Sequence, residues 1–584
     1  MKVKKSKAEV TKNQGVTYTP EELARFMARR LVEIWLKRRE GTPTAVRVLD
    51  PAVGEGALLC AVYDELVQKF DGHIELVGVD IDADALEMAR ERCAYVMDAG
   101  RSALTLVEGD FLEMTHEQLG SVDLVIANPP YVRTQNMGAA SYQKIAAQFG
   151  LKGRADLSLA FLLNTLSLKK SRGCVVVVVP NSLLLTTAAK GVRMQILDAA
   201  RLEEIWDLGD TRLFDAAVLP VVLGLSGSGE GGGEQLLSDV SVYSAYTARL
   251  PDGVEPVRMG VIDALEGWGE IQGEEIVFCQ ESEQDKVFGL RAGYLGITPH
   301  DLGWVLRSPS YEELLRVTRQ DKWCHLSELG SIKVGVKSCA DKVFLRDDWH
   351  RFDVEPEMLQ EVMTHRNARA FCAKNGEGYQ LLYPHYRKSS GKRGVYALDD
   401  YPGLGKYVRK NRKVLKKRKY LEKVGRLWYE LWVPQDPDGW EGDKVIWRDI
   451  ATRPEMWLDR DGAVVNGDCY WFKMSEDVVC ESWGEDVLWL LLALGNSDFA
   501  VHFYEAIAGH QIYSGRRRYM ARYLELFPLP DMALLQSQEL IDLAKLLYES
   551  PERYEELKPK LDALAWDAWG LDGDAFREFS YFTL

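Results

Sequence analysis

The sequence has few cysteines and no long apolar run, and both absences exclude classes of protein. Its nine cysteines in 584 residues are scattered and include no Cys-x-x-Cys pair, so we expect reduced, mostly packed thiols and no structural zinc. No apolar run approaches the roughly 20 residues that cross a bilayer, so we expect no membrane-spanning helix. The N-terminus is positively charged without a following apolar stretch, which argues against a secretory signal and predicts a cytoplasmic protein.

An overall excess of positive charge is also missing. The 72 lysines and arginines against 88 acidic residues give a formal net charge of −16, which excludes a protein held to nucleic acid by overall basicity. Residues 387–426, however, hold 15 basic and three acidic residues, a local charge of +12 that leaves −28 on the rest of the chain. This contrast predicts one basic surface in an otherwise acidic protein.

Two basic segments are candidates for contacts with nucleic-acid phosphates. Residues 406–420 predict a basic helix with few apolar anchors, and residues 516–523 interleave arginines with tyrosines. The alternatives are a solvated helix face for the first segment and arginines that lie over core tyrosines for the second. The candidate contact residues are Arg409, Lys410, Lys416, Lys417, Arg418, Arg516, Arg517 and Arg518.

The first part of the chain has the pattern of a parallel α/β sheet. From residue 46 to about residue 225, short runs of Val, Ile and Leu alternate with segments of helical period, as expected for strands covered on both faces. The predicted strands are residues 46–50, 75–80, 103–107, 122–127 and 173–180. We therefore predict a doubly wound, mostly parallel α/β fold of Rossmann-like type over residues 1–240. Residues 241–584 predict a mixed α+β domain with a helical C-terminal part.

A glycine turn follows the first predicted strand. Gly54 and Gly56 lie where the backbone must bend and admit a ligand, but Leu59 replaces the third glycine of a dinucleotide-binding loop. This favours a smaller nucleoside cofactor. Asp80 ends the second strand, where it either accepts hydrogen bonds from ribose hydroxyls or caps the next helix. At the third strand end, Asp110 is placed to accept from an adenine amino group and Phe111 to stack on its ring.

The fourth predicted strand ends in Asn128-Pro129-Pro130-Tyr131. Two prolines give a rigid loop at the edge of a parallel sheet where α/β proteins bind ligands. An amino group on an aromatic ring is a weak nucleophile because its lone pair is delocalised. If the Asn128 side-chain oxygen and the Pro129 carbonyl each accept one N–H, the lone pair is directed toward an electrophile, while Tyr131 stacks on the base.

In this order the motifs resemble the gamma class (TaqI type) of S-adenosylmethionine-dependent N6-adenine DNA methyltransferases. The resemblance implies a class I methyltransferase fold, S-adenosyl-L-methionine as cofactor, Asn128 to Tyr131 as the catalytic loop, and Phe214 as a second aromatic against a flipped adenine. Where the family commonly has glutamate after the first strand, this chain has the shorter Asp50. The implied cofactor-binding residues are Thr19, Pro20, Asp50, Pro51, Ala52, Gly54, Gly56, Asp80, Ile81, Asp110, Phe111 and Asn128.

The C-terminal half resembles the family's specificity domain, less sharply, at residues 329–338, 401–407, 428–431, 494–497 and 527–530. The implied partner is double-stranded DNA, with a cognate restriction endonuclease or other defence-complex subunits as possible companions. A nuclease-like Pro437-Asp438 segment lacks the required spacing before Lys444, and no metal site is expected. The alternatives are a DNA-recognising subunit active only within a larger defence complex, or a methyltransferase acting on RNA or on protein glutamine.

Overall fold

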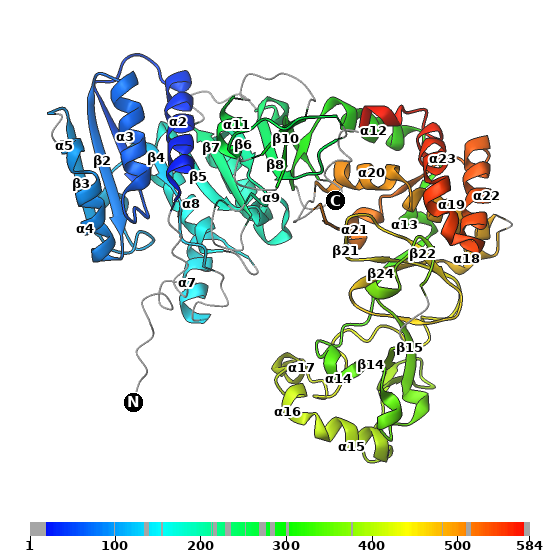
Figure 1. Ribbon diagram of the computed structural model, residues 1–584. Coiled ribbons are helices and arrows are strands. Elements are labelled where there is room, and N and C mark those ends of the chain that lie inside the picture. Colours follow the sequence, from blue (N-terminus) through cyan, green and yellow to red (C-terminus); the bar gives the residue numbers. More distant parts are fainter. Residues whose placement is uncertain are drawn as a thin grey trace. The chain divides into compact units, whose positions relative to one another are not determined.

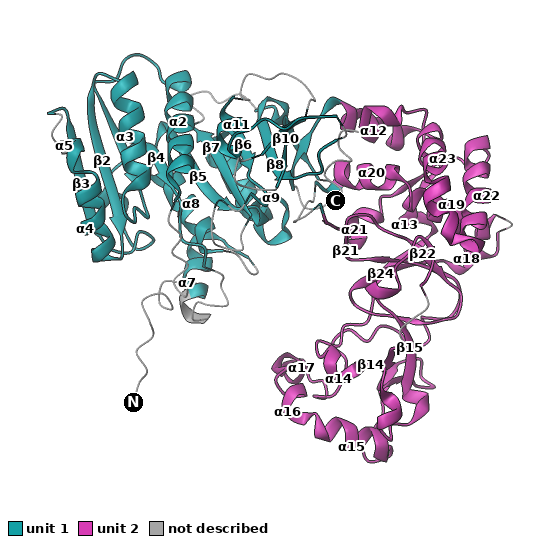
Figure 2. Ribbon diagram, viewed as in Figure 1, with its two compact units in different colours: residues 1–309, 508–515, 581–584 teal, residues 310–507, 516–580 magenta. Residues whose placement is uncertain are grey.

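The computed structural model describes two compact units. The described residues are 19–97, 100–132, 139–152, 156–211, 213, 219–227, 235–251, 253–267, 276–280, 286–298, 303–374, 378–481, 483–509 and 515–576. Unit 1 comprises residues 1–309, 508–515 and 581–584, and unit 2 comprises residues 310–507 and 516–580 (Figure 2).

Unit 1 is built on one eleven-stranded sheet (Figure 1). Its strands are β1 (Ala45–Asp50), β2 (His73–Asp80), β3 (Ser102–Glu108), β4 (Val122–Ala127), β5 (Lys169–Pro180), β6 (Arg201–Asp207), β7 (Pro220–Ser226), β8 (Ser241–Thr247), β9 (Val277–Cys279), β10 (Phe288–Ile297) and β11 (Trp304–Arg307). The strand order is β3-β2-β1-β4-β5-β7-β6-β8-β10-β11, with β9 paired to β10. The first five strands are parallel, whereas β7 runs antiparallel to both β5 and β6.

Helices cover both faces of this sheet. One hydrophobic core holds residues from α2 (Glu21–Arg38), α3 (Ala57–Lys69), α4 (Ala83–Arg92) and α11 (Val261–Gly267). The other holds residues from α8 (Leu157–Leu168), α9 (Ser182–Leu185) and α10 (Lys190–Ala199). Short helices α5 (Ala94–Met97) and α6 (His116–Leu119) and the longer α7 (Ala139–Phe149) complete the described helices of this unit. The predicted doubly wound, mostly parallel fold is confirmed.

Two sequence predictions differ from the structure of unit 1. The boundary expected near residue 240 lies inside the sheet, because β8 to β11 extend it beyond β6 as far as Arg307. Cys60 and Cys93 form a disulfide between α3 and the end of α4, with a Cα–Cα distance of 5.9 Å. The prediction of reduced thiols throughout was therefore wrong for this pair, because packing brings together two cysteines that are 33 residues apart.

Unit 2 combines several small sheets with short helices. A five-stranded sheet has the order β13 (Gly330–Val334), β24 (Cys469–Met474), β20 (Lys444–Arg448), β22 (Trp457–Asp459) and β16 (Phe371–Cys372). A four-stranded sheet has the order β14 (Leu345–Arg346), β17 (Gln380–Leu382), β15 (Leu359–Met363) and β23 (Val464–Val465). Three strand pairs complete the described sheets: β12 (Cys324–His325) with β26 (Pro528–Leu529), β18 (His385–Arg387) with β19 (Arg393–Val395), and β21 (Ile450–Ala451) with β25 (Arg517–Arg518).

The described helices of unit 2 include α12 (Pro309–Gln320), α13 (Leu326–Leu329), α14 (Asp341–Phe344), α15 (Pro402–Lys410), α16 (Arg412–Leu415), α17 (Lys419–Lys423), α18 (Glu476–Val479), α19 (Gly484–Gly495), α20 (Asp498–Ala508), α21 (Ala521–Leu524), α22 (Leu535–Glu549) and α23 (Tyr554–Asp567). None of the described helices is by itself long and apolar enough to cross a bilayer. Taken together, α19 and α20 meet that criterion in length and composition, but they are bent by 79°.

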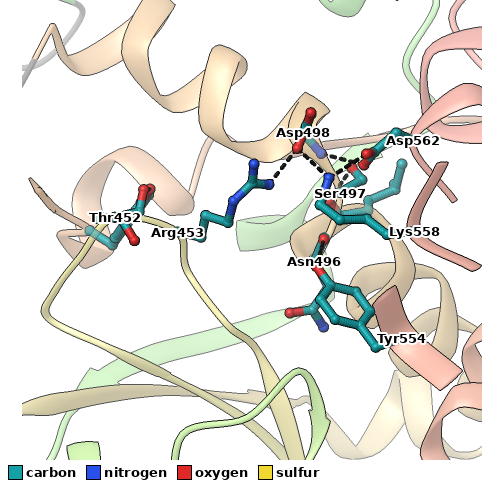
Figure 3. Close-up of polar contacts among 10 residues, drawn as sticks. Thr452, Arg453, Asn496, Ser497, Asp498, Tyr554, Lys558 and Asp562 are labelled. Carbon is teal, nitrogen blue, oxygen red and sulfur yellow. Dashed lines mark hydrogen bonds and ion pairs between the residues drawn. The ribbon is translucent and has the colours of Figure 1, made fainter. Parts of the chain in front are cut away.

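A polar cluster connects the C-terminal helices to the chain that follows β21 (Figure 3). The Asp498 carboxylate, at the start of α20, is paired with Arg453 and lies 2.7 Å from Lys558 Nζ of α23. Burial would raise the pKa of Asp498, but these two cations outweigh it and lower the pKa to about 2. The Tyr554 hydroxyl donates to the Asn496 carbonyl at 2.7 Å. These contacts hold three distant segments of unit 2 together.

Candidate functional site

The loops predicted to carry chemistry gather at one edge of the unit 1 sheet. Strands β1, β2, β3 and β4 are parallel neighbours, so their carboxyl ends share that edge. They end at Asp50, Asp80, Glu108 and Ala127. The glycine turn, the three predicted cofactor acids and the loop that begins at Asn128 therefore lie at the ends of adjacent strands, as expected for a ligand site in an α/β fold.

The glycine turn is held against the end of β2. Gly54 and Gly56 have φ values of 50° and 84°, a region that L side chains rarely adopt. The Gly54 N–H donates to Asp80 Oδ2 at 2.9 Å, and the Asp82 N–H donates to Asp80 Oδ1 at 3.0 Å. Asp80 thus shapes the loop, and its carboxylate has lone pairs left for a ligand. At Gly56, a Cβ would also lie 3.1 Å from Cys93 Sγ, a tight approach that adds to the preference for glycine set by its φ value.

Asp50 is a buried carboxyl group at the end of β1. Its Oδ1 accepts from the Ala52 N–H at 3.0 Å, whereas its Oδ2 has no hydrogen-bond partner among the described residues. Burial raises the pKa of this carboxyl to about 8, against the lowering effect of the Ala52 N–H. An orphaned carboxyl oxygen at a ligand edge fits a cationic group such as the amino group of an amino acid. The shorter Asp50 therefore still offers the acceptor that the family's glutamate would supply.

The other predicted cofactor residues lie in different environments. Ile81 is 68% exposed beside Asp80, as an apolar contact for a ligand requires, and Asp110 is exposed. Phe111 is only 1% exposed and packs against Phe161 with ring centroids 5.3 Å apart. The predicted stacking of Phe111 on an adenine ring is therefore not supported, because its ring is used by the core. Pro51 is buried and Ala52 is half-buried in the turn after β1.

The predicted catalytic loop is held in place by side-chain hydrogen bonds. Asn128 is 8% exposed, and its Nδ2 donates to Thr19 Oγ1 at 2.9 Å. The Tyr131 hydroxyl donates to Asn128 Oδ1 at 3.0 Å. Thr19, followed by Pro20 just before α2, was predicted to touch the cofactor; the structure also brings it to Asn128, which sequence reasoning missed because 109 residues separate the two. Phe214 lies outside the described residues.

The first predicted basic segment divides into exposed and buried residues. It forms α15, α16 and α17 instead of one helix. Lys410, Lys416 and Lys417 are exposed, and Arg409 is exposed but paired with Asp399. Arg418 is 5% exposed, and its guanidinium donates to the Ser338, Trp428 and Glu430 carbonyls at 2.6 to 3.0 Å. The predicted phosphate contact of Arg418 was therefore wrong, since its donors are used inside the fold.

The second basic segment divides in the same way. Arg517 is fully buried and pairs with Glu505 at 2.5 Å, so its predicted contact with DNA was wrong. Arg518 is exposed, but its Nε lies 3.0 Å from Asp449 Oδ1, so its guanidinium is paired with an acidic residue. Arg516 is exposed. The alternation arises because β25 pairs with β21, and successive side chains of a strand point to opposite faces.

A basic hairpin lies outside both predicted segments. Arg387 of β18 stands opposite Arg393 of β19, and the turn between them exposes Lys388 and Lys392. Arg387 and Arg393 line, with Arg426, a pocket of about 440 Å³. Like charges directly opposite each other destabilise a strand pair unless an anion compensates them, and Arg387 is compensated in part by Asp436 at 2.9 Å. The sequence shows the local excess of basic residues in this region. Only the structure shows that two of its segments pair as a hairpin.

This fold is that of a class I S-adenosylmethionine-dependent methyltransferase. Comparisons with known proteins agree. Residues 3–226 match the family model for N-6 DNA Methylase. The type II methyltransferase M.BanIII of Aneurinibacillus aneurinilyticus is 30% identical to the chain, over 96% of this chain and 98% of the relative. M.BstVI of Geobacillus stearothermophilus is 23% identical over 88% of this chain and 93% of the relative.

The chain belongs to the N6 DNA methyltransferase family, because the likeness to M.BanIII extends over nearly the whole of both proteins. Methylation of adenine in DNA is the activity of this family, which includes enzymes of restriction-modification systems. A solved structure, the DrdV–DNA complex determined by cryo-electron microscopy, resembles the fold with a TM-score of 0.51 and 12% identity. It matches 93% of this chain and 58% of the DrdV chain, so this chain corresponds to little more than half of that protein.

Proposed function

We propose that this protein is a gamma-class, site-specific adenine-N6 DNA methyltransferase, in which unit 1 carries the chemistry and unit 2 recognises the DNA target. The observation that carries the proposal is the position of Asn128 and Tyr131 directly after β4, beside the Asp50 turn of the neighbouring strand β1. An acceptor for an amino group and a buried carboxyl for a cation are thus next to each other on one sheet edge. The order of motifs, cofactor residues first and target domain last, supports the gamma class.

Unit 1 offers a set of groups suited to S-adenosylmethionine, which when bound supplies an electrophilic methyl group. Asp50 Oδ2 would accept from the amino group of its methionine part, since that oxygen is buried and has no hydrogen-bond partner among the described residues. Gly54 and Gly56 let the backbone approach the ligand before the N-terminus of α3. Asp80 would accept from the ribose hydroxyls of the cofactor, and Ile81 and Asp110 would contact its adenine.

The chain's own residues then activate the acceptor amine. Asn128 Oδ1 and the Pro129 carbonyl each accept one N–H of the adenine amino group, so that its lone pair turns out of the ring plane toward the methyl group. The surroundings of Asn128 exclude most water, which strengthens these hydrogen bonds. Proton loss follows transfer, and none of the described residues is required as a nucleophile. The Tyr131 ring stacks on the base.

An adenine inside a duplex cannot reach this loop, so the base must rotate out of the helix. Such flipping costs a few kcal/mol in lost stacking and pairing, which contacts elsewhere on the duplex must offset. Unit 2 offers such contacts at the exposed Lys410, Lys416 and Lys417 and at the β18–β19 hairpin. All of these lie within residues 387–426, whose local charge is +12. We propose these exposed residues as the phosphate-binding surface, in place of the buried Arg418 and Arg517.

A methylation assay tests the proposal. The purified chain and labelled S-adenosylmethionine are incubated in parallel with genomic DNA, bulk RNA and a bacterial release factor, and labelled DNA is then digested to nucleosides. We expect label in N6-methyladenine at one recurring sequence. Label in protein or RNA alone would contradict the proposal. DNA labelled only after other subunits are added would instead favour a component of a larger defence complex.

A further inference from the structure

Both ends of the Asn128 side-chain amide are engaged by hydroxyl groups of different kinds. The amino end donates to the aliphatic hydroxyl of Thr19 at 2.9 Å, and the carbonyl end accepts from the phenol of Tyr131 at 3.0 Å. Asn128 is 8% exposed, so little water is available to replace either partner. These contacts leave the proposed accepting atom, Oδ1, on the side of Tyr131.

The orientation of this amide decides whether it can act on an amine. The two ends of an asparagine amide have nearly the same shape but opposite hydrogen-bonding character. With Oδ1 toward the substrate, the amide accepts an N–H; rotated by half a turn about its last bond, it would present N–H donors to an amine that must itself donate. A rotated Asn128 therefore binds the adenine amino group poorly and cannot redirect its lone pair.

The two hydroxyls are not interchangeable, and their difference selects one orientation. A phenol oxygen shares its lone pair with the ring, so it accepts hydrogen bonds less well and donates better than an aliphatic hydroxyl. Burial, and then the Asp156 carboxylate, raise the pKa of the Tyr131 phenol above its usual value, so it remains a donor at physiological pH. A donor on the Tyr131 side and an acceptor on the Thr19 side match the observed amide and oppose the rotated one.

We infer that Thr19 and the Tyr131 hydroxyl form a clamp that fixes the Asn128 amide with Oδ1 facing the acceptor amine. This inference rests on the proposed function, and it gives Thr19 a positioning role beyond contact with the cofactor. A carbonyl oxygen has two lone pairs, so Oδ1 accepts from Tyr131 and from the substrate N–H at the same time. The clamp therefore does not have to open during methyl transfer.

The test compares two substitutions of Thr19. Thr19→Val keeps the shape of the side chain and removes the acceptor, whereas Thr19→Ser keeps the hydroxyl; Thr105→Val, on the exposed face of β3, is the matched control. Single-turnover methyl transfer is measured with saturating S-adenosylmethionine and an adenine-containing duplex, and cofactor affinity is measured by calorimetry. We expect Thr19→Val to slow transfer about tenfold, the loss of roughly one hydrogen bond, with cofactor affinity within threefold. Thr19→Ser should stay near the wild-type rate.

A second measurement uses Asn128→Asp as the background. A carboxylate has an acceptor oxygen at both ends, so it has no wrong orientation to be prevented. Thr19→Val should therefore change the slow transfer rate of Asn128→Asp by less than about twofold, although it changes the wild-type rate about tenfold. In parallel, Tyr131→Phe, which keeps the stacking ring, should slow transfer in the wild-type background.

Three outcomes would overturn the clamp. These are an unchanged transfer rate in Thr19→Val, a loss confined to cofactor affinity with a normal rate at saturation, and an equal loss in the wild-type and Asn128→Asp backgrounds. The wild type is measured in every series, which separates this inference from the proposed function. A wild type that does not methylate adenine in DNA counts against the proposed function, whereas an active wild type with an unaffected Thr19→Val variant counts against the clamp alone.

Discussion

The catalytic loop of unit 1 and the basic region of unit 2 are built in opposite ways. Asn128 is uncharged, nearly buried, and held at both ends of its amide by hydrogen bonds. Lys416 and Lys417 are charged and exposed, and no described acidic residue pairs with either of them. The first arrangement positions one group closely for chemistry. The second places mobile charges where a phosphate backbone of any sequence can meet them.

In both basic segments, adjacent residues of the same charge differ in burial, so charge alone does not show which residues can contact DNA. Lys417 is exposed, whereas the next residue, Arg418, is buried and donates to four backbone carbonyls. Arg516 is exposed, whereas Arg517 is buried with Glu505. The planar guanidinium has five donors, so it can satisfy several carbonyls at once, which a lysine cannot. Some of the charge that suggests DNA binding therefore stabilises the fold of unit 2.

The largest effect is expected at the catalytic loop. Asn128→Ala removes the acceptor without adding charge, so methyl transfer should fall at least about 10³-fold, because a preorganised hydrogen bond to the reacting group is lost. Cofactor affinity should change no more than a few-fold. Single-turnover kinetics and calorimetry measure the two quantities. If transfer survived within a few-fold, the proposed mechanism would be wrong.

The next effect separates structural from exposed arginines. Arg517→Met removes the cation of the buried Arg517–Glu505 ion pair, so the free energy of unfolding of unit 2 should fall by about 3–5 kcal/mol. Arg516→Met, one residue away on an exposed side chain, should change it by less than about 1 kcal/mol. Urea denaturation followed by tryptophan fluorescence gives both values. Equal effects of the two substitutions would show that the buried Arg517 contributes no more to stability than the exposed Arg516.

A third effect concerns Asp50 and pH. Its pKa is about 8 in the free protein, so the carboxyl is mostly protonated at neutral pH. A ligand ammonium group binds the carboxylate form better, so binding releases a proton, and affinity should rise with pH up to about 8 and then level off. S-adenosylhomocysteine, which has the same amino group, should bind up to about tenfold more tightly per pH unit between about pH 6 and 8. Asp50→Asn should remove this dependence on pH. A wild-type affinity that does not vary with pH would show that Asp50 does not bind the ammonium group.

The smallest effect is expected at the exposed lysines. Replacing Lys416 and Lys417 together by alanine should weaken DNA binding and reduce the slope of log affinity against log salt by roughly one per lost phosphate contact. Lys560→Ala, an exposed lysine of α23, is the control. Binding to a labelled duplex is measured by fluorescence anisotropy at several salt concentrations. An unchanged slope would show that α16 and the residues after it do not contact DNA phosphates.

The parts of the site that follow from local chain chemistry could be predicted. Runs of Val and Ile require buried strands, glycines at positive φ require a tight turn, and prolines after Asn128 require a rigid loop, so the sheet edge and its loops follow from short segments. Phe111 could not be placed correctly, because its ring packs against Phe161 of α8, which belongs to a distant segment. The same holds for the Cys60–Cys93 disulfide and for the end of the sheet at β11.

The sequence by itself determined the class of fold, the order of the motifs, and the chemistry that a loop of Asn128, two prolines and Tyr131 can perform, because these depend on residues adjacent in the chain. Only the tertiary structure decided which charges are exposed and what orients the catalytic amide. Burial of Arg418 and Arg517 and the bond from Asn128 to Thr19 depend on contacts between residues far apart in the chain. Such contacts form when whole elements pack, and no local pattern records them.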